Sequence, residues 1–358
     1  MNLKQFPAAA MRLIDAGVAI EVIGPPGVGK TAAIRQLRKK LSERDGFEWG
    51  LSEVLLTSYS PQDVAGYLIP GKDADGVWRA RFTEPAFFTQ RDGRPLSEFK
   101  RSIVLADEMA QADPDVKKAF SGVLLEGKAG THALPPGTAR IAASNRSKDR
   151  SGVTKSYDHI TNRRAELHIV PDLDAWLDWA NEAGMRPEFT AFASHHFDVV
   201  FSGEVPARPG PWCTPRSLHL LADTLTVGLD VDAPIPDDSE TLEIAEGLVG
   251  DAGPQLFAMI RLRNQLPAYE EILSRPDRAG VPEKPDAIML VLHLLAARVT
   301  NPTMEAVTTY LRRLPGEFAV PFGTMALRRD TDLVNSKAFS TWAMEHAALT
   351  QAITAARR

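Results

Sequence analysis

The chain has 358 residues, of which 44% are hydrophobic and 24% are charged. This length exceeds the size at which one hydrophobic core keeps growing, so we expect two or more packing units, and the composition excludes a disordered chain. The net charge of −5 argues against a general electrostatic affinity for nucleic acid, although a local basic strip remains open.

Cysteine content and apolar patterning bear on the cell compartment. The single cysteine, Cys213, excludes an internal disulfide framework and fits a reducing compartment. No apolar run approaches the length of a membrane span, and the N-terminal stretch carries Arg12, Asp15 and Glu21 where a signal peptide would be uncharged. We therefore expect a cytoplasmic protein without membrane insertion.

The first elements form a strand, a glycine loop and a helix. Residues 5–16 are predicted to be helical up to Gly17, and residues 18–23 (VAIEVI) are predicted to form a buried strand. The stretch TAAIRQLRKKLSERDG has apolar residues at 34, 37 and 41 with basic residues between them, which predicts a helix with one buried face.

The loop between that strand and that helix, GPPGVGKT, matches the pattern GxxxxGK[ST] of a phosphate-binding loop. Its glycines allow backbone N–H groups to turn toward phosphates, and the next helix adds its positive N-terminal end. Lys30 would reach the β- and γ-phosphates of ATP, and the Thr31 hydroxyl would ligate Mg²⁺. The alternative is a chance glycine turn, which the flanking strand and helix disfavour. The predicted nucleotide-binding residues are Gly24, Pro25, Pro26, Gly27, Val28, Gly29, Lys30, Thr31 and Ala32.

The next feature is a predicted hairpin at about residues 64–84, two short extended runs around a GKDADG turn. Alternation along its second run places Trp78, Ala80 and Phe82 on one face and two arginines on the other. An exposed aromatic and basic tip could grip a client protein. We expect instead that Trp78 and Phe82 pack on the core, as most large aromatic side chains do.

Three further apolar runs are predicted strands, at 53–57, 102–106 and 139–144, which together with intervening helices indicate a parallel sheet covered on both faces. The run IVLADE ends in Asp107 and Glu108, the Walker B arrangement. Asp107 would hold Mg²⁺, commonly through water, and Glu108 would polarise the attacking water. The alternative is a pair of surface acids at a strand end, which the upstream phosphate loop disfavours.

Three more residues are candidates for contacts with the γ-phosphate. Asn145 ends the run ARIAASN and could orient the water from a neighbouring strand, or it could simply form a turn. Arg163 and Arg164 in TNRRAELHI could supply a guanidinium to a neighbouring subunit, whereas most paired arginines are solvated or ion-paired.

From about residue 172 the chain is predicted to be helical throughout, with segments divided by proline and glycine. In CTPRSLHLLADTL, Thr214 can cap a helix that begins at Pro215, which places Arg216 in the first turn. A cation there opposes the helix dipole and needs an anion as compensation, either a phosphate or a nearby carboxylate.

Taken in order, these stretches resemble the MoxR-like branch of the AAA+ ATPases, a dynein-related group. The resemblance rests on GPPGVGKT, PQDVAGYLIP, VLADEMAQADPDVKKAFSGVLLEG, ARIAASN, TNRRAELHI and CTPRSLHLLAD, and it covers residues 1 to about 225. It implies an α/β fold, a P-loop αβα core with a five-stranded parallel sheet, followed by an all-helical lid and a C-terminal helical region.

The same resemblance implies roles and partners. Asn145 would be sensor 1, Arg216 sensor 2, and Arg163 or Arg164 the arginine finger that acts on the next subunit. Arg164 stands where the family usually has phenylalanine, and Arg146 where proline usually follows sensor 1. The family implies a homo-oligomeric ring, commonly a hexamer, that binds ATP and Mg²⁺ and acts on a client protein or on a partner with a von Willebrand factor A domain.

We therefore predict three regions: an ATPase core at 1–171, a lid with sensor 2 at 172–228, and a C-terminal helical region at 229–358. The predicted function is a Mg²⁺-dependent AAA+ ATP hydrolase that remodels or activates a protein partner as a chaperone. The alternative is a nucleic-acid motor or a restriction- or helicase-type ATPase, which acidity and the lack of a recognisable nucleic-acid-binding module disfavour.

Overall fold

The computed structural model describes the chain except for residues 150–162, 231–232, 348–350 and 352–358. The chain divides into two compact units. Unit 1 comprises residues 1–172 with 203–205, and unit 2 comprises residues 173–202 and 206–358. None of the helices within the described ranges is long and apolar enough to cross a bilayer.

A five-stranded, fully parallel sheet forms the centre of unit 1, in the order β2-β5-β8-β1-β9. Its strands are β1 (Ala19–Ile23), β2 (Gly50–Leu55), β5 (Ser102–Asp107), β8 (Thr138–Ser144) and β9 (Arg164–His168). The predicted five-stranded parallel core is confirmed. The strand expected at 53–57 lies at 50–55 instead, because Gly50 to Ser52 also pair with β5 although they carry no apolar pattern.

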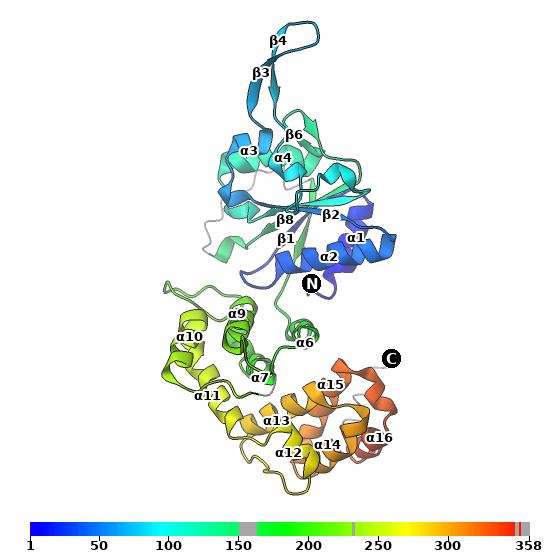
Figure 1. The fold of residues 1–358 in the computed structure, drawn as a ribbon, viewed down its shortest axis with the longest axis vertical. Helices are drawn as coiled ribbons and strands as arrows, with labels where there is room; N and C mark the ends of the chain where they lie inside the picture. Colours follow the sequence, from blue (N-terminus) through cyan, green and yellow to red (C-terminus); the bar gives the residue numbers. More distant parts are fainter. Residues whose placement is uncertain (150–162, 231–232, 348–350, 352–358) are drawn as a thin grey trace. The chain divides into compact units, whose positions relative to one another are not determined.

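Helices cover both faces of this sheet (Figure 1). One face packs on α1 (Phe6–Asp15) and α2 (Lys30–Asp45) through the cluster that includes Phe6, Ile34 and Ile141. The other face packs on α3 (Pro61–Ala65) and α4 (Pro114–Glu126) through the cluster that includes Val64, Phe120 and Val104. Burial on both faces explains why these strands are near-continuous apolar runs in the sequence.

A hairpin of β3 (Leu68–Lys72) and β4 (Trp78–Phe82) extends away from the sheet of unit 1 (Figure 1). A second, very short pair, β6 (Lys128–Ala129) and β7 (His132–Ala133), follows α4. The expected packing of Trp78 on the core is wrong, because its side chain is 67% exposed, and Phe82 is only half-buried. The hairpin departs from the sheet, so the aromatic side chain near its tip finds no core to cover it.

We expect Trp78→Ala to change the free energy of unfolding by less than about 1 kcal/mol, because the side chain loses only exposed contacts and a cation–π contact with Lys72. The matched control is Trp49→Ala in the same unit, where the side chain is fully buried and the expected loss is about 3–5 kcal/mol. Urea unfolding followed by circular dichroism compares the two variants. A loss for Trp78→Ala similar to that for Trp49→Ala would contradict the exposed hairpin.

Unit 2 is helical over its described residues, as predicted. Its helices are α6 (Leu173–Glu182), α7 (Pro187–His195), α8 (Phe197–Val200), α9 (Pro215–Thr226), α10 (Ser239–Val249), α11 (Gly253–Asn264), α12 (Tyr269–Ser274), α13 (Pro285–Arg298), α14 (Met304–Leu311), α15 (Ala319–Arg329) and α16 (Lys337–Met344). They build two hydrophobic clusters, one mainly from α6 to α11 and one mainly from α12 to α16. Trp176 and Leu177 of α6 are buried in the first cluster.

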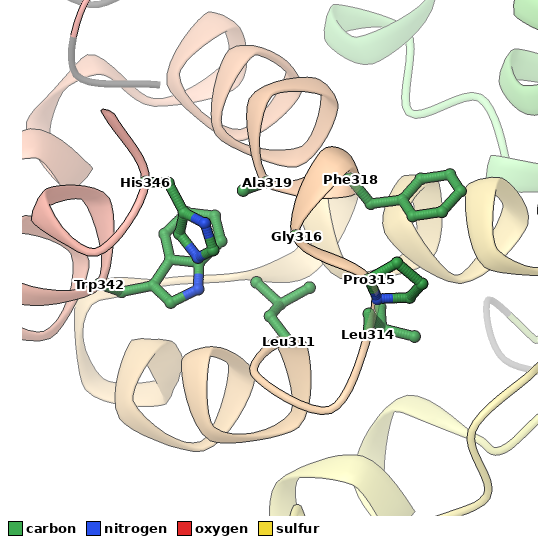
Figure 2. A pocket seen from close by; sticks show the side chains of 8 residues that line it. All are labelled: Leu311, Leu314, Pro315, Gly316, Phe318, Ala319, Trp342 and His346. Carbon is green, nitrogen blue, oxygen red and sulfur yellow. The ribbon is translucent and has the colours of Figure 1, made fainter. Parts of the chain in front are cut away.

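A small pocket lies in the second cluster, between the end of α14 and α16 (Figure 2). Leu311, Leu314 and Trp342 line it, and the rings of Trp342 and His346 meet edge to face at 5.1 Å. Its volume of about 10 Å³ is close to that of one water molecule. The pocket is therefore too small for a nucleotide or any comparable ligand.

Candidate active site

The glycine loop connects the end of β1 to the start of α2, as predicted. Gly27 and Gly29 have φ angles of 73° and 98°, values at which a side chain would be strained. The loop thereby turns into the first turn of α2, a helix of 16 residues whose free N–H groups and dipole favour an anion. This local geometry is that of a phosphate-binding loop.

Lys30 is the first residue of α2, and its side chain lies folded over the loop. The ammonium donates hydrogen bonds to the carbonyl oxygens of Gly24 at 2.9 Å and of Pro25 at 3.0 Å, and to Asn145 Oδ1 at 2.8 Å. The residue is only 8% exposed, so the charge lies in the loop and not in solvent. Lys30 and Asn145 are thus brought together although 115 residues separate them.

Thr31 and Asp107 form the second pair of the site. The Thr31 hydroxyl donates a hydrogen bond of 2.8 Å to Asp107 Oδ2. Mg²⁺ takes oxygen ligands at about 2.1 Å in an octahedron, in which neighbouring ligands lie about 3 Å apart. The two oxygen atoms therefore fit one Mg²⁺ ion, with phosphates and water as its other ligands.

Glu108 follows Asp107 directly and is held in an unusual backbone conformation. Its φ angle of 55° is the only positive value at a non-glycine residue in the described part of the chain. Its side chain is exposed and accepts a hydrogen bond of 3.2 Å from the Thr57 hydroxyl. Such left-handed conformations cost free energy and gather at functional sites. Sequence reasoning missed Thr57, although a polar residue at the end of the strand predicted at 53–57 was a usable signal.

The strand order explains why these groups meet. The loop follows β1, Asp107 ends β5, and Asn145 follows β8, which lies between those two strands. Because the strands are parallel, all three sites lie at the carboxyl edge of the sheet, where α/β proteins bind ligands. Asn145 therefore lies between the loop and the acidic pair, as expected for a residue that contacts the γ-phosphate from an adjacent strand.

The two candidate finger arginines occupy different environments. The side chain of Arg164 is 4% exposed and forms an ion pair with Glu21 of β1, with Glu166 at 3.3 Å as a further partner. Arg163, in the turn directly before β9, is exposed. Thr161 and Asn162 of the same stretch lie outside the described residues. Of the two arginines, only Arg163 is placed to reach another molecule.

Arg163 lies at the opposite edge of the sheet from the phosphate loop of its own chain. Arg164 pairs with Ala19, the first residue of β1, and His168 pairs with Ile23, the last. These four residue steps correspond to about 13 Å along a strand. Arg163 is therefore remote from the site that its own chain builds.

Arg216 lies in unit 2, in the first turn of α9. Thr214 caps this helix with Ser217 in a capping box and Pro215 is its first residue, so the predicted helix start is confirmed. The Arg216 side chain is exposed. Its contact with a phosphate stays a prediction, and so does its role as sensor 2.

Arg146 and Gly203 lie next to the candidate site, and the sequence did not predict that these two residues would contact each other. Arg146 forms an ion pair of 2.6 Å with the buried Asp149 and donates to the carbonyl oxygen of Gly203. A side-chain atom at Gly203 would lie 3.2 Å from Pro25 of the phosphate loop. The segment 203–205 thus packs on the loop from a distant part of the sequence, within unit 1.

Two further titratable side chains, His195 and Cys213, belong to unit 2. Among the described residues, no cluster of three or more His, Cys, Asp or Glu side chains could hold a metal ion. His195 faces Asp286 at 3.2 Å. Burial raises the pKa of the Cys213 thiol to about 12, so this cysteine stays protonated and is no nucleophile.

No protein-family model and no curated protein matches the chain. Among solved structures, the chain is similar to NtrX from Brucella abortus, with 15% sequence identity and a TM-score of 0.39. The match covers 78% of this chain and 62% of the NtrX chain, so this chain spans less than two thirds of the length of NtrX. A further NtrX structure, in complex with ADP, is 16% identical over 98% of this chain and 67% of that one, with a TM-score of 0.39. A mutant of RuvB from Thermotoga maritima is 14% identical over 84% of this chain and 85% of that one, with a TM-score of 0.36. Likeness at these levels assigns no activity to this chain.

Proposed function

We propose that this protein is a Mg²⁺-dependent ATPase of the AAA+ type that works as a ring of identical subunits and remodels or activates a protein partner. One observation carries the proposal. Lys30 meets Asn145 and Thr31 meets Asp107, each at 2.8 Å, at the carboxyl edge of one parallel sheet. A phosphate loop alone would support binding, whereas this convergence also supports hydrolysis.

In the proposed reaction, Lys30 and the backbone N–H groups of the loop bind the β- and γ-phosphates. Thr31 and Asp107 would hold Mg²⁺, which would supply positive charge to neutralise the phosphates. Glu108 orients a water molecule and accepts its proton, while Asn145 directs that water at the γ-phosphorus. The bond to the bridging oxygen breaks, so that ADP and phosphate leave. Thr57 keeps the Glu108 carboxylate in place between turnovers.

The ring is proposed from the position of Arg163. Its guanidinium is exposed but remote from its own phosphate loop, so a contact with a γ-phosphate requires the site of a neighbouring copy. Such a guanidinium stabilises the charge that develops in the transition state. The proposed ring is a hexamer in which Arg216, as sensor 2, contacts the nucleotide and makes the position of unit 2 respond to it.

The action on a client is proposed from the hairpin. Its apolar face includes Leu68, 57% exposed, and Trp78, and the opposite face carries Arg79 and Arg81. An exposed aromatic side chain beside exposed cations is typical of a surface that binds another protein. The client itself, or a partner with a von Willebrand factor A domain, remains part of this proposal.

Phosphate release in the presence of ATP and Mg²⁺ tests the proposal. We expect turnover per subunit to fall steeply when the protein is diluted below the concentration at which the ring dissociates, because each site then lacks Arg163. Chelation of Mg²⁺ should abolish turnover at any concentration. Sedimentation at the same concentrations reports the assembly state.

Two results would count against the proposal. A monomer that hydrolyses ATP at undiminished rate on dilution would remove the shared site. Stimulation of turnover by DNA, weakened steeply by added salt, would instead support the nucleic-acid motor.

A further inference from the structure

A buried group of charges lies beside the active site and takes no part in the chemistry described so far. Glu21 is the middle residue of β1 and is 4% exposed. The Arg164 side chain of β9 forms an ion pair with Glu21, and the hydroxyl of Ser144, the last residue of β8, donates to Glu21 Oε1. A carboxylate at the centre of an apolar sheet is costly unless it is paired in this way.

The partners of this carboxylate are the chain neighbours of two active-site residues. Ser144 directly precedes Asn145, whose side chain accepts the hydrogen bond from Lys30. Arg164 directly follows Arg163. Consecutive Cα atoms are about 3.8 Å apart, so holding Ser144 and Arg164 in place restrains the positions of Asn145 and Arg163.

The group runs diagonally across three strands. Arg164 lies at the start of β9, Glu21 in the middle of β1, and Ser144 at the end of β8. Its helix-side neighbour is Lys117 of α4, which is 3% exposed and donates to the carbonyl oxygen of Ala110 at 2.5 Å. Burial lowers the pKa of Lys117, Glu21 raises it and Arg164 lowers it, as expected for charges that share one low-dielectric space.

We infer that Glu21, Ser144 and Arg164 form a positioning network that holds Asn145 for the site of its own subunit and Arg163 for the site of the next one. The inference rests on the proposed function, because it needs Arg163 to act in another copy. It adds three residues to the machinery, none of which touches nucleotide.

The two ends of the network serve different sites, so subunit mixing separates them. A defect at Arg164 misplaces Arg163 and harms the neighbour's site, while its own site stays intact. A defect at Ser144 misplaces Asn145 and harms its own site, while its Arg163 stays intact. A network that only stabilised the fold would not produce this difference.

The test uses the full chain in two variants, Arg164→Lys and Ser144→Ala. Lysine keeps the charge of arginine but loses its planar fork of donors. We expect kcat to fall about tenfold in each, since small misplacements of catalytic groups cost up to about 100-fold. For Arg164→Lys, KM for ATP should change less than about twofold, because its phosphate loop is untouched. Arg44→Lys, at a paired arginine on α2 remote from the site, is the matched control and should retain wild-type kcat.

Mixing then assigns each defect to a site. Arg164→Lys subunits should regain activity with Lys30→Ala subunits, which cannot bind ATP but supply an intact Arg163. Ser144→Ala subunits should regain activity with Arg163→Ala subunits and gain none with Lys30→Ala subunits. Identical behaviour of the two variants in both mixtures, or wild-type kcat in each, overturns the inference.

A double variant distinguishes a loss of activity from a loss of folding. Glu21→Met with Arg164→Met removes both charges of the pair together, so neither is left without the other and the net charge of the group with Lys117 is unchanged, a replacement that is often neutral for stability. We expect it to unfold at the wild-type urea midpoint, to bind ATP, and still to lose about tenfold in kcat. Wild-type kcat would show that the pair is only structural. Failure of the proposed shared site is a separate result: Arg163→Ala mixed with Lys30→Ala then regains no activity.

Discussion

Glu108→Gln should stop ATP hydrolysis while leaving ATP bound. The glutamine keeps the size of the side chain and a hydrogen-bonding oxygen for Thr57, but it cannot accept a proton from water. Loss of a general base typically costs about 10²- to 10⁴-fold in rate. Single-turnover phosphate release measures the chemical step, and a fluorescent ATP analogue measures binding.

Binding should be unchanged in this variant, because Lys30, Thr31 and Asp107 are untouched. ATP should therefore accumulate in the assembly and stabilise it, which sedimentation will show. The matched control is Glu126→Gln at the end of α4, where the side chain is exposed, and it should keep wild-type turnover. Full turnover in Glu108→Gln would move the general base to another residue.

Lys30→Ala should lose ATP binding itself. The ammonium donates hydrogen bonds to Gly24, Pro25 and Asn145, so it points into the loop that would hold the phosphates. Each hydrogen bond to a charged group contributes about 1.5–3 kcal/mol, which corresponds to about 10- to 150-fold in affinity, and Lys30 would donate to both the β- and the γ-phosphate, so the loss should exceed that of one bond. Calorimetric titration with ATP and Mg²⁺ measures the change.

The control for this variant is Lys40→Ala, an exposed lysine on the same helix. Its affinity for ATP should match that of the wild type, since it lies nearly three turns further along α2. Circular dichroism should show both variants folded. If Lys30→Ala bound ATP as tightly as Lys40→Ala, the loop would be a structural turn and the proposed site would fall.

Local patterns in the sequence were sufficient for several parts of the fold and site. The glycine loop could be placed because strand, GPPGVGKT and amphipathic helix are adjacent in the chain, and the start of α9 because Thr214 and Pro215 are adjacent. The hairpin was also found from alternation and its turn. Its exposure was not, because a sequence does not show whether a two-stranded ribbon lies on a core or leaves it, and Trp78 was placed wrongly for that reason.

The choice between Arg163 and Arg164 shows the same limit. Both are arginines in one short stretch, and nothing in their spacing distinguishes an exposed side chain from a buried one. The register of β9 on β1 places Arg164 beside Glu21, a residue 143 positions earlier, and leaves Arg163 outside. Thr57 was missed because its partner, Glu108, is 51 residues away.

Residue type and neighbours along the chain were enough to predict which side chains would bind phosphate and magnesium. Tertiary structure decided which of them meet. Insertion of β8 between β5 and β1 brings Asn145 to Lys30, and the β1–β9 register buries Arg164. Strand order and register depend on how buried surfaces and distant hydrogen bonds combine over the whole sheet, and a local pattern carries no information about that combination.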